Sequence, residues 1–333
     1  MKKLLLVKND KIGDFVLMWP AFYLLKTALP DTSIEVFVSP VVADFARACP
    51  YIDNVIADTG DDTQLRQTIN DANYDVVLVS SSELRIYNLV KNSGASYTLA
   101  PKHKWFQYLY KHRVNNLYEK HEGCWRGGCL LVEHFLKHHN IAIPALPKQY
   151  WDASENRHKW LQHYGHQAGE KLIFVHPGTG GSSGRVAESD YINLITQLHG
   201  QLNHPVRFIL TYNGDELVLA QNIHQGLAQS DINIDIAKPL SSLTDFAESI
   251  VAADMFIAGS TGPLHLAGLH NVATVGFYAG RRSAPHIRWQ TLSQAEKRFA
   301  FTPPVGRKTG RNMALIDFDK VATETAQYLN AQN

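Results

Sequence analysis

Short apolar runs alternate with amphipathic segments through the first half of this chain. The apolar runs predict strands at residues 4–7, 34–38, 54–56 and 75–79. The segments between them predict helices at residues 15–29, 42–48 and 64–72, the first of them broken early by Pro20 and stopped by Pro30. Short strands that are apolar almost throughout are typical of a parallel sheet covered on both faces, so the first half predicts an α/β domain.

The same alternation restarts in the second half of the chain. Strands are expected at residues 171–176, 206–211, 232–236, 252–258 and 272–277. Helices are expected at residues 190–202, 216–226, 243–252 and 318–330, and a further helical segment at 129–139 closes the first half. A proline-marked polar stretch begins at residues 143–147 and is interpreted as the domain boundary. We therefore expect two α/β domains, residues 1–150 and 151–333, with the closing helix free to pack back on the first.

Composition narrows the class of protein without naming a function. The chain has 333 residues, a 45% hydrophobic share and a net charge of +1, which is typical of a two-domain globular protein and gives no global field for nucleic acid. The apolar run after Lys2-Lys3 ends at once in Lys8-Asn9-Asp10-Lys11, so it predicts a first strand rather than a signal peptide. No run approaches the roughly 18 apolar residues of a membrane span.

Cysteine usage favours reduced thiols in the cytoplasm. The three cysteines, Cys49, Cys124 and Cys129, form no CxxC pair, and ordinary packing is the interpretation preferred for them. A metal held by Cys124 and Cys129 with His121 or His134 is the alternative, but that spacing matches no standard site.

The most informative stretch is Gly259-Ser260-Thr261-Gly262-Pro263-Leu264-His265, which follows an apolar strand and opens a helical segment. The free N–H groups of a first helical turn and the helix dipole favour an anion. Ser260 and Thr261 add hydroxyl donors, and His265 adds a ring nitrogen one turn later. The stretch therefore suits the diphosphate of a nucleotide or nucleotide-sugar; plain helix capping and a core histidine are the alternatives.

A second polar loop follows the first predicted strand. It reads Lys8-Asn9-Asp10-Lys11-Ile12-Gly13-Asp14 and leads into an apolar helix. Asp14 is either a helix cap or a general base that takes a proton from a sugar hydroxyl, with Asp10 as a second carboxylate nearby. Lys8 and Lys11 would help to attract an anionic acceptor.

Residues 101–126 differ from the rest of the chain. They carry six Lys or Arg against two Glu, with six interleaved aromatic residues, and read as rich in loops. The basic members are Lys102, Lys104, Lys111, Arg113, Lys120 and Arg126, and the aromatic members are Trp105, Phe106, Tyr108, Tyr110, Tyr118 and Trp125. Such a stretch suits an anionic glycan or a membrane headgroup layer, or is an ordinary solvated cover with buried aromatics. Single-stranded nucleic acid is disfavoured because the net charge is near zero and no nucleic-acid module is present.

Three motifs together resemble glycosyltransferase family 9, the ADP-heptose:lipopolysaccharide heptosyltransferases. They are Leu5-Leu6-Val7-Lys8 with Ile12-Gly13-Asp14, His176-Pro177-Gly178, and Ser260-Thr261-Gly262-Pro263-Leu264-His265-Leu266-Ala267, and the resemblance spans nearly the whole chain. It implies a GT-B fold, in which two Rossmann-like domains face each other across a cleft. The donor would bind to the C-terminal domain and the acceptor to the N-terminal one. It also implies an inverting reaction with no metal or cofactor, the ADP-sugar being a substrate.

The resemblance assigns residues to the donor. Asp14 matches the catalytic base, and Lys8 matches a lysine near the donor phosphates. The other positions implied for donor binding are Thr179, Arg185, Glu216, Ser260, Thr261, Gly262 and His265. Ser260 stands where the family often has Asp, and Gly184-Arg185-Val186-Ala187 stands where it has Lys-x-Trp-Pro, so that Arg185 is the nearest cation. Glu216 would bind the ribose hydroxyls, with Asp215 as the alternative.

The implied acceptor is the Kdo-bearing lipid A inner core at the cytoplasmic face of the inner membrane. Residues expected to bind it are Lys11, Arg85, Lys102, Lys104, Arg113 and Arg126. Gly280-Arg281-Arg282 either closes over the nucleotide or caps the sheet. We expect a cytoplasmic, peripherally membrane-associated monomer that transfers heptose from ADP-heptose to this inner core and binds no nucleic acid. The alternatives are a relative with another donor or acceptor, and a nucleotide-sugar-binding protein with impaired catalysis.

Overall fold

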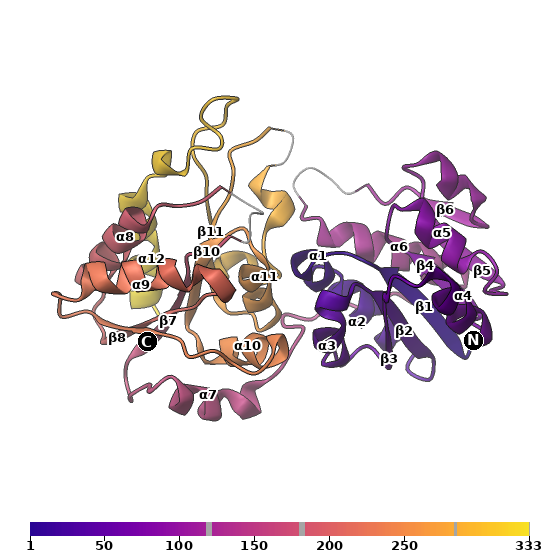
Figure 1. Cartoon of the computed structure of the whole chain (residues 1–333), viewed down its shortest axis with the longest axis horizontal. Coiled ribbons are helices and arrows are strands. Elements are labelled where there is room, and N and C mark those ends of the chain that lie inside the picture. Colours follow the sequence, from indigo (N-terminus) through magenta and orange to yellow (C-terminus); the bar gives the residue numbers. More distant parts are fainter. Residues whose placement is uncertain (118–121, 180–183, 283–284, 333) are drawn as a thin grey trace. The chain divides into compact units, whose positions relative to one another are not determined.

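The computed structural model describes residues 1–117, 122–179, 184–282 and 285–332 (Figure 1). The chain divides into two compact units, Met1–Trp151 and Asp152–Asn333. Tyr118, Lys120 and His121, and residues 180–183 of the Gly/Ser loop, lie outside the described residues. Each unit is built around its own sheet.

The first unit contains a six-stranded, wholly parallel sheet with the order β3-β2-β1-β4-β5-β6. Its strands are β1 (Lys3–Lys8), β2 (Ser33–Val38), β3 (Asn54–Ala57), β4 (Val76–Val79), β5 (Tyr97–Pro101) and β6 (His112–Val114). Its helices are α1 (Ile12–Val16), α2 (Trp19–Ala28), α3 (Pro40–Arg47), α4 (Asp62–Asp71), α5 (Leu84–Val90) and α6 (Trp125–His138), with a short 3-10 helix, η1, at Trp105–Leu109.

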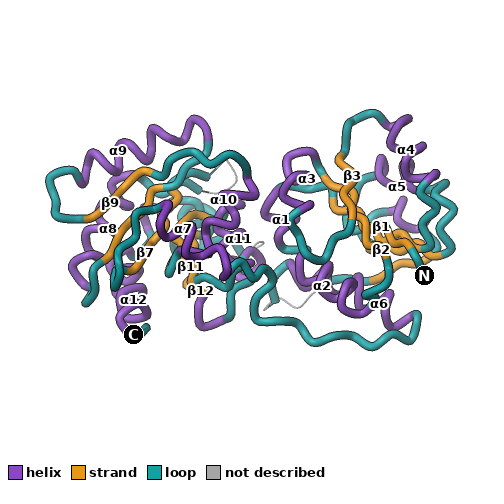
Figure 2. Tube along the Cα trace, turned by 90° about the horizontal axis from the view of Figure 1, so that it is seen from below, coloured by secondary structure: helices purple, strands orange, loops and turns teal. Residues whose placement is uncertain are grey.

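Apolar side chains on both faces of this sheet explain why its strands read as continuous apolar runs. Leu5 and Val7 of β1 pack with Leu65 and Ile69 of α4, and α5 contributes to the same cluster. Alternation along the strand turns Leu4 and the other even positions to the opposite face. The predicted parallel α/β architecture is confirmed in this unit (Figure 2).

The second unit repeats the plan with the order β12-β11-β10-β7-β8-β9, again wholly parallel. Its strands are β7 (Lys171–His176), β8 (Val206–Leu210), β9 (Asn233–Ile236), β10 (Met255–Gly259), β11 (Ala273–Phe277) and β12 (Arg298–Phe301). Its helices are α7 (Arg157–His163), α8 (Glu188–Gln201), α9 (Leu217–Leu227), α10 (Leu243–Ser249), α11 (Gly262–Leu269) and α12 (Phe318–Asn330). Short 3-10 turns occur at Ser154–Asn156, Gly214–Glu216, Ile250–Ala252, His286–Trp289, Ala295–Lys297 and Met313–Leu315.

Helix α12 belongs to the core of the second unit. Its Val321 and Leu329 are fully or almost fully buried in one cluster with Tyr191 and Leu198 of α8, and the two helices lie against each other. Helix α12 is thus an integral part of the second unit; that it also packs back on the first domain stays a prediction.

Local differences from the sequence-based prediction have simple causes. The segment expected at 15–29 is two helices, as the early break at Pro20 predicts: α1 ends at Val16, and Pro20 lies in the first turn of α2, where a missing N–H leaves no bond unmade. Strands β5, β6 and β12 and helices α5 and α7 were not predicted. β6 and β12 are edge strands with one neighbour each, so their sequences need no continuous apolar run. The stretch 101–126, expected to be rich in loops, contains η1, β6 and the start of α6.

Both sheets share one strand order, which places the motif loops. In each unit the next two strands along the chain are added on one side of the first strand, and the last three are added on its other side. The strand order therefore reverses between β1 and β4 and between β7 and β10. Ligands of doubly wound sheets bind at the carboxyl ends of the strands at such a point. The loops after β1, β7 and β10 carry the three sequence motifs, so all three lie at these positions.

Candidate functional site

The N-terminus of α11 has the properties of an anion site. Thr261 precedes the helix, and Gly262 begins it. The Ser260 N–H donates to the Phe277 carbonyl at 3.0 Å and the His265 N–H to the Thr261 carbonyl at 3.3 Å. Pro263 has no N–H, so helix geometry leaves those of Gly262 and Leu264 without an acceptor inside the helix. Positive dipole ends thus remain at this strand-to-helix turn.

Two buried side-chain atoms at this turn have no hydrogen-bond partner. They are Oγ1 of Thr261 and Nδ1 of His265, on side chains that are 5% and 3% exposed. A buried polar group left unpaired costs about 1–3 kcal/mol, so such groups are usually satisfied. Both atoms are therefore candidates to bind a ligand at this turn.

Burial also determines the charge of His265. It lowers the pKa of the imidazole to about 4, because the charged form loses its hydration. The ring is thus neutral at pH 7, and one tautomer carries its proton on Nδ1. In that form His265 donates a hydrogen bond without adding a full positive charge.

The loop after β7 is held by Glu216. The Thr179 N–H donates to Glu216 Oε1 at 2.8 Å, and His176 Nε2 lies 3.8 Å from Glu216 Oε2. His176 Nδ1 is 3.0 Å from Thr211 Oγ1, and burial lowers the pKa of this histidine to about 4, opposed by the Glu216 charge. Glu216 therefore holds the backbone at Thr179, at the start of the loop, whereas the alternative carboxylate, Asp215, is exposed.

Arg185, the expected substitute for a family lysine, is already paired. Its Nη2 lies 2.7 Å from Glu188 Oε1, in a side chain that is 56% exposed. Glu188 also accepts a hydrogen bond from Asn222 at 2.9 Å. A phosphate bound by Arg185 would share its charge with this carboxylate.

In the first unit, the loop after β1 is tied to the ends of its neighbouring strands. The Asn9 N–H donates to Ser81 Oγ at 3.1 Å, and its side-chain amide donates to Asp58 Oδ2 at 2.9 Å. Lys8 Nζ lies 2.8 Å from Asp10 Oδ2, and the Ser39 hydroxyl donates to the Asp10 carbonyl at 2.7 Å. These bonds hold the loop that leads to Asp14 in one shape.

Asp14 is the third residue of α1 and is partly buried, between Lys11 at the N-cap and the buried Phe15. It is therefore not the capping residue that one interpretation of the sequence made it. An acidic residue in the first turn is a favourable position with respect to the N–H groups at the start of a helix.

The cations expected to bind an acceptor fall into two groups. Arg85 and Arg126 are engaged: Arg85 holds Asp58 in two hydrogen bonds and Asp62 at 2.7 Å, and Arg126 binds Glu122 and Glu133. The Arg85 guanidinium keeps the pKa of Asp58 below its usual range. Exposed cations form the other group, namely Lys11, Lys102, Lys104 and Arg113, although Arg113 also donates to the Tyr110 carbonyl at 3.0 Å.

The 3-10 helix after β5 presents apolar side chains to solvent. Trp105, Tyr108 and Leu109 are 72%, 62% and 52% exposed, and Lys102 and Lys104 directly precede them. Phe106 and Tyr110 are buried. The basic-aromatic stretch thus has both an outward-facing and a packed set of aromatics.

The cysteines lie in the packed interior of the first unit or at the start of α6. Cys49 and Cys129 are buried and Cys124 is partly buried, all as free thiols. Within the described ranges no three His, Cys, Asp or Glu side chains group as metal ligands would. His121, named as one possible ligand, lies outside those ranges.

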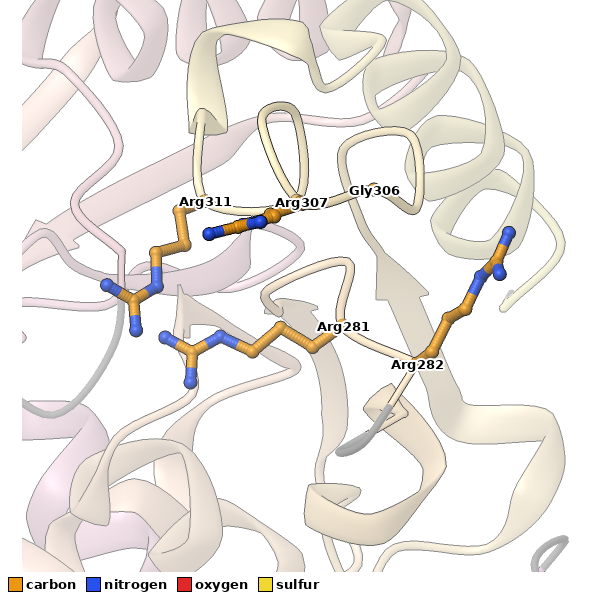
Figure 3. A pocket seen from close by; sticks show the side chains of 6 residues that line it. Arg281, Arg282, Gly306, Arg307 and Arg311 are labelled. Atoms are coloured by element: carbon orange, nitrogen blue, oxygen red, sulfur yellow. The ribbon is translucent and has the colours of Figure 1, made fainter.

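Four arginines line a cavity in the second unit, and the sequence pointed to two of them. Arg281 and Arg282, noted after β11, line a cavity of about 770 Å³ together with Arg307 and Arg311 (Figure 3). The missed signal is the repeated Gly-Arg pair in Gly306-Arg307-Lys308-Thr309-Gly310-Arg311.

Comparison with known proteins gives a consistent result. The model of glycosyltransferase family 9 (heptosyltransferase) matches residues 63–302. A Haemophilus influenzae protein named "Putative glycosyltransferase" is 36% identical over 99% of this chain and 97% of its own length. The structure of E. coli ADP-heptose lps heptosyltransferase II aligns with a TM-score of 0.77 at 16% identity, over 100% of this chain and 99% of that one. E. coli heptosyltransferase WaaC with ADP aligns with a TM-score of 0.75 at 16% identity, over 98% and 99%.

The structural likenesses concern the fold alone at these identities. They extend over both units, each with the same doubly wound strand order. The expected class, an α/β chain of two Rossmann-like domains with the GT-B fold, is confirmed. In the described part of the chain no helix has the length and apolar character needed to cross a bilayer.

Proposed function

Because this chain belongs to glycosyltransferase family 9, we propose that it transfers heptose from ADP-heptose to the Kdo-bearing inner core of lipopolysaccharide, with inversion and without a metal. The glycosyltransferase class follows from the family. The donor is supported by two proteins of the same fold, E. coli ADP-heptose lps heptosyltransferase II and E. coli heptosyltransferase WaaC with ADP. The acceptor is supported by the lipopolysaccharide (lps) in the name of the first of them.

One observation carries the proposal: the unpartnered Thr261 Oγ1 and His265 Nδ1 at the start of α11. When the sugar leaves, negative charge grows on the departing diphosphate and needs preorganised donors. The two side chains and the first-turn N–H groups supply them without any prior rearrangement. Ser260 and Gly262 belong to the same turn.

Glu216 completes the donor site. Its carboxylate faces the loop that carries Thr179, at the carboxyl end of β7. A carboxylate accepts hydrogen bonds from vicinal hydroxyls, so Glu216 is assigned to the ribose. Lys8 adds a cation in the first unit, although Asp10 shares its charge.

Asp14 is the proposed general base. It accepts the proton of the acceptor hydroxyl, and the oxygen then attacks the anomeric carbon on the face opposite the diphosphate. The bond from the anomeric carbon to the phosphate oxygen breaks, and its electron pair leaves with ADP. A single displacement of this kind inverts the configuration.

Membrane association is proposed through η1. Exposed Trp105, Tyr108 and Leu109 suit the headgroup layer, and Lys102 and Lys104 suit its anionic lipids. The acceptor is itself a lipid-linked glycan, so a cytoplasmic monomer that docks reversibly on the inner leaflet would meet it there.

The test of the proposal is release of ADP from ADP-heptose in the presence of Kdo2-lipid A. Asp14→Asn should abolish release while ADP affinity stays near that of the natural chain. Activity should also survive EDTA. Full activity of the Asp14 variant would refute the mechanism, and loss of activity restored by magnesium would refute metal independence.

A second candidate rests on Arg185. Where the family has a Lys-x-Trp-Pro stretch, this chain has an arginine already bound to Glu188. This favours a relative with another donor or acceptor, or a nucleotide-sugar-binding protein with impaired catalysis. Turnover with a different nucleotide-sugar would establish the first alternative, and ADP binding without turnover across several donors and acceptors would establish the second.

A further inference from the structure

Two loops at the carboxyl ends of β11 and β12 are joined by their backbones. The Gly280 N–H donates to the Gly310 carbonyl at 2.8 Å, and the Gly306 N–H donates to the Gly280 carbonyl at 3.3 Å. A Cβ at Gly280 would overlap the Pro303 carbonyl, and one at Gly310 would overlap the Gly280 carbonyl. Only glycine permits this approach, so these residues hold the loops together.

Each of the three glycines is followed directly by an arginine. Arg281, Arg307 and Arg311 thus start from the points at which the loops are joined. With Arg282 they line the cavity of about 770 Å³. Figure 3 shows the side chains of Arg281, Arg307 and Arg311 extending the same way, whereas Arg282 extends in the opposite direction.

These arginines differ from the paired ones elsewhere in the chain. Arg85, Arg126 and Arg207 each bind carboxylates, but no ion pair joins Arg281, Arg307 or Arg311 to a carboxylate in the described ranges. Like charges on one wall repel each other, and a bound anion would relieve that cost. Guanidinium forks bind phosphate and carboxylate groups through paired hydrogen bonds.

The residues that line the cavity are other than those assigned to the donor. They follow β11 and β12, whereas the turn at Thr261 and His265 follows the neighbouring strand β10. A donor diphosphate carries about two negative charges and is already met by the α11 terminus. The volume lies within the roughly 300–1,000 Å³ of ordinary ligand pockets, which accommodates a saccharide rather than a single ion.

We infer that Arg281, Arg307 and Arg311 form a second anion subsite, which binds the phosphate or carboxylate groups of the acceptor glycan. This inference rests on the proposed function, because it takes the anionic ligand to be the acceptor.

The experiment is calorimetric binding of two ligands to the full chain. The ligands are ADP and deacylated, phosphorylated lipopolysaccharide core oligosaccharide. In the triple variant Arg281→Gln, Arg307→Gln, Arg311→Gln, oligosaccharide affinity should fall about tenfold to a hundredfold, as for lost charge-assisted hydrogen bonds. ADP affinity should stay within about twofold, as for separate sites. Lys308→Gln is the control, since it removes a positive charge from the same loop as Arg307 at an exposed residue that does not line the cavity, and it should bind both ligands normally.

Several outcomes would overturn the inference. An unchanged oligosaccharide affinity in the triple variant would reject the subsite, and an equal loss of ADP affinity would assign the arginines to the donor. Loss of binding to anionic lipid vesicles with oligosaccharide binding intact would make the cavity a membrane contact. Oligosaccharide treated with phosphatase distinguishes phosphate from carboxylate as the group that is bound. Equal affinity of the natural chain and the triple variant for the treated oligosaccharide identifies phosphate. A higher affinity of the natural chain identifies carboxylate.

Failure of the proposed function would look different. If the natural chain released no ADP from any heptose donor while the triple variant still lost oligosaccharide affinity, the reaction would be wrong and the subsite would stand. The arginines are exposed, so unchanged thermal unfolding of the variants confirms that their fold is intact.

Discussion

The carboxylate of Glu216 occupies the space that a side chain on Gly178 would need. A Cβ on Gly178 would overlap the Glu216 carboxylate, whose Oε1 accepts the N–H of the next residue, Thr179, at 2.8 Å. Gly178→Ala should therefore displace Glu216 and reshape the loop after β7. We expect ADP affinity to fall about tenfold, the effect of one displaced charge-assisted hydrogen bond, as measured by calorimetry.

Gly200→Ala is the control for this prediction. Gly200 lies in α8 with open space around its Cα, so alanine there should stabilise the helix by about 0.5–1 kcal/mol and leave ADP affinity alone. Normal ADP binding by the Gly178 variant would show that Glu216 does not hold the nucleotide.

Thr261→Val separates a ligand contact from a structural one. Valine has nearly the same shape but removes an unpaired buried hydroxyl, so the ligand-free protein should be as stable as before, or more stable by about 1 kcal/mol. ADP affinity should fall about tenfold because the hydroxyl is lost to the phosphate. Thermal unfolding and calorimetry measure the two effects.

Thr325→Val provides the comparison. Thr325 of α12 also has a fully buried hydroxyl oxygen without a partner, within the core of the second unit. Its replacement should change stability in the same direction and ADP affinity not at all. A Thr261 variant with unaltered ADP affinity would contradict the assignment of the α11 terminus.

Acid should destabilise the second unit through His176 and His265. Burial holds the pKa of each at about 4, below the unfolded value of about 6.5. Below pH 6.5 the two histidines are protonated in the unfolded chain but stay neutral in the folded chain. Stability is thus fully present above that pH and falls as pH decreases toward 4, by about 1.4 kcal/mol per pH unit for each histidine. Thermal unfolding between pH 7.5 and 4.5 measures the loss.

His265→Gln should reduce this pH dependence, because glutamine does not titrate. The variant should keep more of its pH 7.5 stability at pH 5 than the natural chain does. An identical loss in both would mean that His265 is protonated without cost in the folded state.

Arg85 is expected to contribute to the stability of the fold more than to acceptor binding. It holds Asp58, whose other partner is the Asn9 amide in the loop after β1. Arg85→Ala should lower the free energy of unfolding by about 1 kcal/mol or more, since a carboxylate that is 9% exposed loses its cation. Asp58→Asn should have a similar effect. Unchanged thermal stability with a raised KM for the acceptor would instead make Arg85 an acceptor residue.

The low pKa of Asp58 gives this pair a pH signature. A carboxyl group with a lowered folded pKa stabilises the protein above its unfolded pKa of about 3.9, and the gain is lost as pH falls through the folded value. The Arg85 variant should therefore differ from the natural chain at neutral pH and converge with it in strong acid.

Membrane docking is predicted to depend on η1. Trp105→Ser with Leu109→Ser should reduce co-sedimentation with anionic vesicles about tenfold or more, since both side chains are more than half exposed and lose their apolar area. Val305→Ser is the control, because Val305 is 56% exposed but lies in the second unit. Equal vesicle binding by all three proteins would argue against η1 as the docking segment.

The sequence alone determined the α/β class, the restart of the pattern and the loops that carry the chemistry. A continuous apolar run such as Leu4–Val7 buries all its side chains only in a sheet that is covered on both faces. The local pattern therefore implies a parallel α/β architecture. Edge strands such as β6 were not predicted, because a strand with one neighbour does not need a continuous apolar run.

Only the tertiary structure decided which polar groups are already satisfied. In the sequence, Asp14, Arg85 and Arg185 are all candidate site residues. In the structure, Arg85 binds a carboxylate distant in sequence and Arg185 binds one nearby. The Thr261 hydroxyl and His265 Nδ1, by contrast, have no hydrogen-bond partner. At the arginine cavity, likewise, Gly280 contacts Gly306 and Gly310, which lie 26 and 30 residues further along the chain, and no local pattern encodes these contacts. The physical reason is that apolar periodicity is a property of neighbouring residues, whereas the pairing of charges and donors depends on which distant segments the fold brings together.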